Sequence, residues 1–519
     1  MTTSVRRRRS KTSKVGFVQK PQGRFSERVQ VVGPEHFGIV CIDCAKARSR
    51  YMLADFYGNY LLEPTTLIHS RGHFAAAVDR IRQAQTEHDL RDLIVVIERT
   101  GEYHRPVQRA FRAAGWEVRL MHPYATKQYR QPADPGNKTD DTDLSAIFRG
   151  AVNGFGLMET PWPDAYQQLQ ALRRHRRDLV RKASRLRCQI REVLHAMMPG
   201  YAELFGHLWE HASALFLARH TGSAAAVQQL GFEGLASLVR KADLPYRPKA
   251  LEQILLWADN APPGHSQPAC LGGILADLDD DRLEKTRKIK ALEPSLAHLV
   301  VRSPYLLLLA IPGINIVSTA DLAGELGPIE NYANPNAITG RAALMPCRYQ
   351  SDQVDCQGPL RRSGNRRLRG ALMQIAENLS KKNHYFNARA ATWLRAGKDP
   401  RWIRVKIAKS FSRLGFAMVA GRQMSSHPCC RERHYILAKL MEFHTSHGSL
   451  PQTMRDDLEA AIPQLPAKTR REEIKPLEEH LEELKNRRGP QPLAKIIPLV
   501  LAKLGLRQVQ LTSEGEDPS

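Results

Sequence analysis

Four acidic side chains stand where they could act together on a metal ion. Asp43 ends one apolar run of the chain, and Glu98 ends another. Asp140 and Asp143 are three residues apart at the start of a predicted helix, a spacing that puts both carboxylates on one helical face. If the two apolar runs are neighbouring strands and the helix crosses their ends, the four carboxylates converge.

Such a cluster would repel itself without a divalent cation. Hard oxygen ligands suit Mg²⁺, and paired ions about 3.5–4 Å apart stabilise the attacking and leaving oxygens of phosphoryl transfer. The four acids therefore predict metal-dependent phosphodiester chemistry with Mg²⁺ as cofactor. Two neighbours compete for these roles, Asp141 with Asp140 and Glu102 with Glu98. The alternative interpretation is that each acid is an ordinary solvated residue at the end of its strand.

An α/β domain over residues 37–160 is expected to position these acids. Its strand patterns come first as a meander and then alternate with helices, which is typical of this class. Residues 93–98 are a continuous apolar run that ends in Glu98, as in a strand buried on both faces. The other expected elements are strands over 37–43, 51–54, 60–62 and 117–121 and helices over 73–84, 106–114 and 140–149, the last with Thr139 as N-cap.

The charge of the chain favours a nucleic acid as its partner. Lys and Arg number 77 against 53 Asp and Glu, a formal net charge of +24. Each phosphate contact by a basic side chain releases condensed counterions, which drives binding. Residues 1–36 are polar and strongly basic, and we expect a disordered arm there.

The cysteine content and the lengths of the apolar runs indicate the cellular compartment and whether the chain enters a membrane. Eight sparse cysteines are too few for a disulfide scaffold and fit a reducing cytoplasm. Cys41 and Cys44 have the spacing of a metal-binding pair, but they sit in a strand pattern and no second pair follows, so zinc is not expected. No apolar run is long enough for a bilayer, and the basic start lacks the apolar segment of a secretory signal.

Residues 161–303 predict a helical coiled-coil domain with an insertion. Apolar residues recur every seven positions over 164–198, at Leu172, Leu179, Leu186 and Val193. A second helical stretch, 271–301, is interrupted by Pro294. The first stretch is dense in arginine, and four of its side chains are predicted to contact nucleic acid: Arg173, Arg174, Arg177 and Arg181.

The remainder of the chain is predicted to be mostly helical. Residues 304–424 contain a Pro-Gly turn at 312–313, of the kind that presents backbone N–H groups to phosphate. A loop is expected over 346–365, followed by a basic helix. Further predicted nucleic-acid contacts are Arg361, Arg362, Arg366 and Arg367. Residues 425–519 are charged and helical and are predicted to form an extension without an assignable motif.

Several of these segments, in this order, resemble the Piv-like insertion-sequence transposases of the IS110 family. The segments around Asp43 and Glu98, together with Lys138-Thr139-Asp140-Asp141-Thr142-Asp143, are similar to the RuvC-like (RNase H-like) DEDD domain of that family. Ile311-Pro312-Gly313-Ile314, Tyr349-Gln350-Ser351 and the segment Ser363 to Arg369 are similar to its second, transposase domain. The resemblance covers residues 37–385, and the joint order of the motifs is more specific than any one of them.

The resemblance implies a recombinase that cuts and rejoins DNA. Its acidic site would bind Mg²⁺, and Ser351 would attack DNA to form a phosphoserine intermediate. The implied partners are donor and target DNA, a structured non-coding bridge RNA that selects them by base pairing, and further copies of the chain in a homo-oligomer. The implied location is the bacterial cytoplasm, at the nucleoid.

Two departures and several alternatives stay open. Asp352 follows Ser351 where the family has Gly, and Asn315 follows the Pro-Gly-Ile motif where the family has Gly. Ser363 is a rival nucleophile, and its other interpretation is a helix N-cap. The competing functions are a RuvC-like nuclease, which needs the acids but not Ser351, and an inactive nucleic-acid-binding relic.

Overall fold

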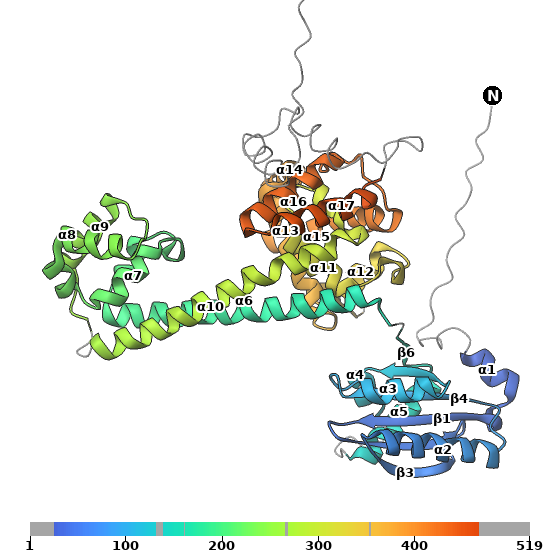
Figure 1. Ribbon diagram of the computed structural model, residues 1–519. Coiled ribbons are helices and arrows are strands. Elements are labelled where there is room, and N and C mark those ends of the chain that lie inside the picture. Colours follow the sequence, from blue (N-terminus) through green and yellow to red (C-terminus); the bar gives the residue numbers. More distant parts are fainter. Residues whose placement is uncertain (1–24, 131–138, 160, 265–267, 352–353, 467–519) are drawn as a thin grey trace, which may run out of the picture. The chain divides into compact units, whose positions relative to one another are not determined.

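The chain divides into two compact units, Met1–Pro161 and Trp162–Ser519 (Figure 1). The computed structural model describes residues 25–130, 139–159, 161–264, 268–351 and 354–466. Among these residues, no helix combines the length and the apolar character that crossing a membrane requires.

The first unit is built on a mixed sheet of six strands in the order β3-β2-β1-β4-β5-β6. The strands β1, β2 and β3 form an antiparallel meander, β4 and β5 continue the sheet parallel to β1, and β6 runs antiparallel to β5. Their bounds are β1 (Phe37–Cys44), β2 (Arg48–Asp55), β3 (Tyr60–Ile68), β4 (Asp92–Glu98), β5 (Glu117–Met121) and β6 (Leu157–Met158). The predicted meander followed by alternating strands and helices is therefore confirmed.

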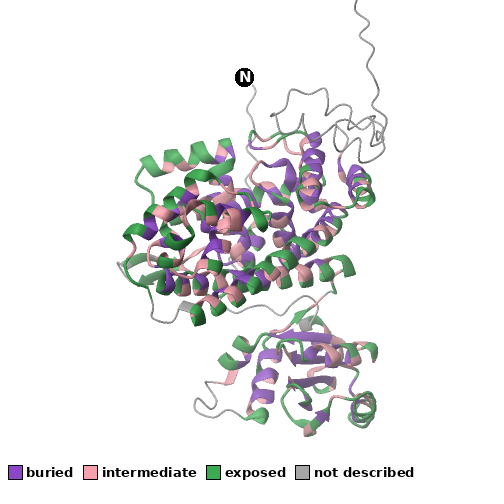
Figure 2. Cartoon of the chain, turned by 60° about the vertical axis from the view of Figure 1, so that its left-hand side comes forward, coloured by how far each residue is buried: buried purple, intermediate pink, exposed green. Residues whose placement is uncertain are grey.

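Both faces of this sheet are covered by helices, which is why its central strands are continuously apolar. Val40 and Ile42 of β1 belong to a buried cluster that includes α2 (Arg71–Glu87) and α3 (His104–Ala113). The alternate residues Ile39 and Cys41 belong to a second cluster that includes α5 (Asp140–Val152). The period of two in side-chain direction thus divides one strand between two cores. Figure 2 shows this concentration of buried residues in the strands.

The N-terminal arm is ordered further than its sequence predicts. Residues 25–36 form α1 (Phe25–Val32) and a short 3-10 helix, Pro34–His36. Arg28 explains this order, because its guanidinium donates to Asp92 (2.7 Å) and Glu117 (2.7 Å) at the starts of two strands. The prediction of a disordered arm over 1–36 is therefore wrong from residue 25, and residues 1–24 lie outside the described residues.

The described residues of the second unit form helices and, at 346–360, one hairpin. Its two longest helices, α6 (Asp164–Met197) and α10 (Pro268–Val301), pack against each other along their length (Figure 1). Pro294 lies inside α10 without ending it. The segment between the two helices folds onto their ends as a separate core that contains α7 (Ala212–Thr221), α8 (Ala224–Lys241) and α9 (Pro248–Asn260).

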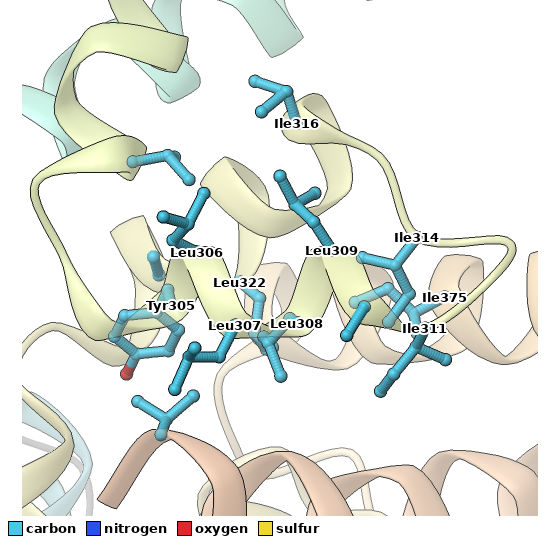
Figure 3. Packing of buried hydrophobic residues seen from close by; sticks show 14 of the residues in the cluster. Tyr305, Leu306, Leu307, Leu308, Leu309, Ile311, Ile314, Ile316, Leu322 and Ile375 are labelled. Carbon is cyan, nitrogen blue, oxygen red and sulfur yellow. The ribbon is translucent and has the colours of Figure 1, made fainter. Parts of the chain in front are cut away.

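The main core of this unit surrounds the 3-10 helix η4 (Pro304–Ala310). Six consecutive residues of it, Tyr305 to Ala310, are buried (Figure 3). The cluster also contains Leu169 of α6 and Val300 of α10, so the boundary predicted between 303 and 304 does not separate two cores. The remaining helices of this core are α11 (Ile316–Leu326), α12 (Pro335–Arg341), α13 (Arg366–Lys382), α14 (His384–Arg395), α15 (Pro400–Gly421), α16 (Arg433–His447) and α17 (Pro451–Ala461).

Two further sequence predictions are corrected in this unit. The predicted extension from residue 425 is part of the main core as far as residue 466, because Ile436, Leu440 and Leu458 are buried in it. The predicted loop over 346–365 is instead a hairpin of β7 (Pro346–Ser351) and β8 (Val354–Leu360). Most of β7 is exposed, so the strand needs no apolar alternation and leaves no strand signal in the sequence.

Candidate active site: a set of acids and a serine hairpin

Asp43 and Glu98 lie at the same end of two neighbouring strands. The strands β1 and β4 are parallel and pair through Ile42 and Ile97, the residues just before the two acids. Carboxyl ends of parallel strands meet at one edge of a sheet, so both carboxylates are placed at that edge. Both residues are half-buried. The prediction that the two strands are neighbours is confirmed.

The pKa of Cys44 also indicates that the carboxylates of Asp43 and Glu98 are close to each other. The pKa of the Cys44 thiol is raised to about 12, mainly by burial; a hydrogen bond with Ser49 opposes this shift, and the carboxylates of Asp43 and Glu98 add to it. Cys41 and Cys44 are three residues apart on one strand and belong to opposite cores. Their sulfurs cannot meet at one ion, which agrees with the expectation that this pair does not bind zinc.

The N-terminus of α5 brings the other acids to the sheet. Thr139 is the N-cap, as predicted: its hydroxyl accepts from the Thr142 amide (3.1 Å), and the Thr142 hydroxyl accepts from the Thr139 amide (2.9 Å). The helix packs against β1, β2 and β4. Asp143 is buried, whereas Asp140 is exposed.

Two arginines hold acids of this segment. Arg130 forms an ion pair with Asp143. Arg50 forms an ion pair with Asp141 (2.7 Å), and it lies directly opposite Asp43 in the backbone register of β1 and β2. The carboxylate oxygens are the donors that Mg²⁺ prefers. Among the described residues, however, no three His, Cys, Asp or Glu side chains are placed to hold a metal ion together. The fold brings the acids to one region, but this arrangement is not a complete ligand set.

Ser351 is the last residue of β7 and lies at the end of the hairpin where β7 connects to β8. It pairs with Val354 of β8, and it is exposed. Arg348 and Asp355 form an ion pair across the ladder (2.6 Å), and this hydrogen bond lowers the pKa of the Asp355 carboxyl. Asp352, which follows the serine, lies outside the described residues. The structure therefore presents the Ser351 hydroxyl at the surface, on a paired strand instead of a loop.

The predicted nucleic-acid contacts divide into exposed and buried groups. Arg173 is fully buried and ion-paired with Asp321 (3.0 Å) and Glu325 of α11, so the prediction that it contacts nucleic acid is wrong. Arg174 also donates to Glu325 (3.3 Å). Burial lowers the pKa of Arg177, which packs beside Gly370. Five of the predicted arginines are exposed: Arg181, Arg361, Arg362, Arg366 and Arg367.

Sequence reasoning missed Asn365 and Glu325. Asn365, not Ser363, is the N-cap of α13, because its side-chain oxygen accepts from the amides of Arg367 and Leu368 (both 3.0 Å). Its side-chain amide donates to the buried Glu325 (2.9 Å). An acid in an otherwise apolar helix segment was the signal that could have indicated a buried partner for Arg173.

The same two regions match known protein families. Residues 40–199 match a model of DEDD transposases of the IS110 type, and residues 305–391 match the IS116/IS110/IS902 transposase family. A transposase for insertion sequence element IS1328 from Yersinia enterocolitica is 24% identical to this chain over 281 residues, which are 54% of this chain and 69% of that protein. The first match contains all four predicted acids, and the second contains the serine hairpin and all of α13.

Proposed function

Since the chain is an IS110-family transposase, an enzyme that cleaves and rejoins DNA, we propose that Ser351 is its nucleophile and that Asp43, Glu98, Asp140 and Asp143 form its metal site. The strand order of the first unit, a meander followed by parallel strands, is compatible with the RuvC-like fold that this assignment implies. The DEDD family implies a divalent cation, typically Mg²⁺.

The observation that carries the nucleophile is the exposure of Ser351 on a hairpin that leads into a basic segment. The serine is exposed at one end of the hairpin. Four exposed arginines follow β8 in the chain, two directly after the strand and two at the start of α13: Arg361, Arg362, Arg366 and Arg367. Guanidinium groups bind phosphate oxygens through paired donors. These arginines suit the backbone of the DNA whose phosphate Ser351 would attack.

The proposed reaction conserves the energy of the phosphodiester bond. The Ser351 oxygen forms a bond to phosphorus, the bond from phosphorus to one deoxyribose oxygen breaks, and the serine proton leaves to a base. The freed deoxyribose oxygen takes up a proton. In rejoining, a hydroxyl of the partner strand attacks the phosphoserine and releases the serine, so no nucleotide cofactor is consumed.

The acids act through the cation that they would hold. When bound, Mg²⁺ supplies charge stabilisation for the phosphate oxygens. Asp43 and Glu98 would hold it from the strand ends, and Asp140 and Asp143 would hold it from the start of α5. Arg130 must release Asp143 before that carboxylate can become a ligand.

We further propose a bridge RNA and a homo-oligomer as partners. Base pairing by the RNA would select donor and target DNA, while the protein binds backbone and shape, as in other RNA-guided systems. The net charge of +24 supports a nucleic acid as partner.

A covalent adduct tests the nucleophile directly. The protein, its guide RNA and a labelled DNA site are incubated with Mg²⁺ and denatured, and label that migrates with the protein is measured. We expect Ser351→Ala to lose the adduct. Ser363→Ala is the matched control and should keep it, because Asn365 and not Ser363 caps α13. Cleavage without an adduct in the wild type would assign the chain to the nuclease alternative, and no cleavage to the relic.

A further inference from the structure

One arginine of the basic helix α13 is directed at backbone carbonyls. The Nε of Arg369 donates to the carbonyl of Ala342 (2.8 Å), and its Nη2 donates to the carbonyl of Arg361 (2.7 Å). Ala342 precedes β7 and Arg361 follows β8. A single guanidinium is therefore bonded to both the segment that enters the serine hairpin and the segment that leaves it.

We propose that Arg369 is a positioning residue, which fixes the base of the hairpin and thereby the place of Ser351. The proposal rests on the proposed role of Ser351 as nucleophile. A nucleophile must be held close to its near-attack geometry, and an exposed two-stranded hairpin is only marginally stable by itself. Contacts at the base of this hairpin are consequently what determine where its far end lies.

The base of the hairpin is closely packed around these two bonds. The Arg361 amide donates to the Met345 carbonyl (3.0 Å), which extends the pairing beyond the strands. Gly364 has φ +137°, and a Cβ there would lie 2.7 Å from the Ala343 Cβ. The entering and leaving segments thus touch, and Arg369 spans them.

The helix that carries Arg369 is itself anchored. Asn365 caps α13 and donates from Nδ2 to the buried Glu325 (2.9 Å). Glu325 is held in turn by Arg173 of α6. These contacts from α6 through Glu325 and Asn365 fix the N-terminus of α13, and they therefore fix the backbone position of Arg369.

Lysine cannot reproduce this contact, although it carries the same charge. The guanidinium offers several donors in a rigid planar fork, whereas the lysine ammonium is one compact group on a flexible stem. Arg369→Lys therefore removes the bridge between two carbonyls and keeps the positive charge. A phosphate-binding role would be largely preserved in this variant, while a positioning role would not.

Hydrogen exchange tests the positioning without any reaction. In full-length Arg369→Lys, we expect faster amide exchange in residues 346–351 and 354–360, with unchanged exchange in the middle of α13. Arg366→Lys, the same substitution at an exposed position of the same helix, should leave hairpin exchange at the wild-type rate. Unchanged hairpin exchange in Arg369→Lys overturns the proposal.

Adduct formation tests the consequence for Ser351. We expect Arg369→Lys to form the protein–DNA adduct roughly 100-fold more slowly, as misplacement by about 1 Å can cost. Its DNA affinity and the salt dependence of that affinity should match the wild type. Adduct formation at the wild-type rate despite a mobile hairpin, or a changed salt dependence with a normal hairpin, overturns the proposal. If the wild type forms no adduct, the role of Ser351 fails, and hydrogen exchange still decides the role of Arg369.

Discussion

Arg130 and Asp143 form an ion pair that is almost closed to water, with side-chain exposures of 16% and 7%. A carboxylate at this depth is costly without a cationic partner. Asp143 is also one of the four proposed metal ligands. A guanidinium and a divalent cation would therefore compete for the same carboxylate, which makes the pair a measurable indicator of metal binding.

Removing Arg130 should destabilise the protein and increase its response to Mg²⁺. Arg130→Gln leaves Asp143 buried without a cation, which should lower the free energy of unfolding by about 3 kcal/mol. Mg²⁺ bound by the freed carboxylate stabilises the folded state by mass action. The measurement is the thermal midpoint of the full-length variant and wild type with and without MgCl₂.

The double variant Arg130→Gln, Asp143→Asn is the control for this experiment. It removes both charges, so the additional Mg²⁺ response should disappear. Equal Mg²⁺ responses in wild type and Arg130→Gln would show that the cation does not bind at Asp143.

Substitution of the strand-end acids should abolish strand cleavage and preserve DNA binding. Asp43→Asn and Glu98→Gln keep shape but remove a charged oxygen ligand, and a loss of at least roughly 100-fold is expected, the size seen when one preorganised electrostatic group is removed. Glu102→Gln is the matched control, because Glu102 is exposed and paired with Arg105 (3.3 Å). Cleavage is measured on a labelled DNA site; an active Glu98→Gln enzyme together with an inactive Glu102→Gln enzyme would reverse the assignment.

The choice between Asp140 and Asp141 can be decided in the same assay. Asp141 is ion-paired with Arg50 (2.7 Å), whereas Asp140 is three residues from Asp143 and lies on the same face of α5. We expect Asp140→Asn to lose cleavage and Asp141→Asn to retain it. The opposite result would identify Asp141 as the ligand and would require Arg50 to move.

The exposed and buried arginines should differ in their effect on DNA binding. Neutralising Arg361, Arg362 and Arg366 together should reduce the slope of log K against log salt by about 0.9 for each lost duplex phosphate contact. Arg173→Gln should leave this slope unchanged and instead lower stability by about 3–5 kcal/mol, because it leaves the buried Glu325 short of a partner. Salt titrations of DNA binding and urea unfolding measure the two effects, and a changed slope in folded Arg173→Gln protein contradicts its buried role.

Lys439 should make stability depend on pH. It lies on α16 and donates to the carbonyls of Ile311 (3.1 Å) and Ile314 (2.5 Å), and burial lowers its pKa from 10.5 to about 7. Between these two values the unfolded chain binds a proton that the folded chain does not, so stability rises with pH by at most about 1.4 kcal/mol per unit. Below pH 7 both states are charged and this contribution is constant.

Comparison with Lys439→Met isolates this contribution. The free energy of unfolding is measured from pH 6 to pH 10.5 for both proteins. The wild type should gain stability relative to the variant as the pH rises through the window. A difference that stays constant with pH would show that the amine is charged in the folded protein throughout.

Local patterns in the sequence identified the central strands, the acids and their cap. The apolar runs of β1 and β4 and the N-cap at Thr139 depend on residues close together in the chain, and each was found where it was expected. The hairpin around Ser351 was missed because local patterns do not reveal an exposed strand. A strand exposed to solvent needs no apolar period, so its pairing leaves no trace that a local reading can detect.

The order of its motifs alone was enough to relate this sequence to a transposase family, but the partners of its charged groups were decided by tertiary structure. Arg173 and Glu325 are 152 residues apart, and Arg369 reaches carbonyls on both sides of a hairpin. An arginine on an Arg-rich helix looks the same in sequence whether it faces water or an acid of another helix. Only packing removes water from one side of α6, and that desolvation converts Arg173 from a phosphate ligand into a structural ion pair.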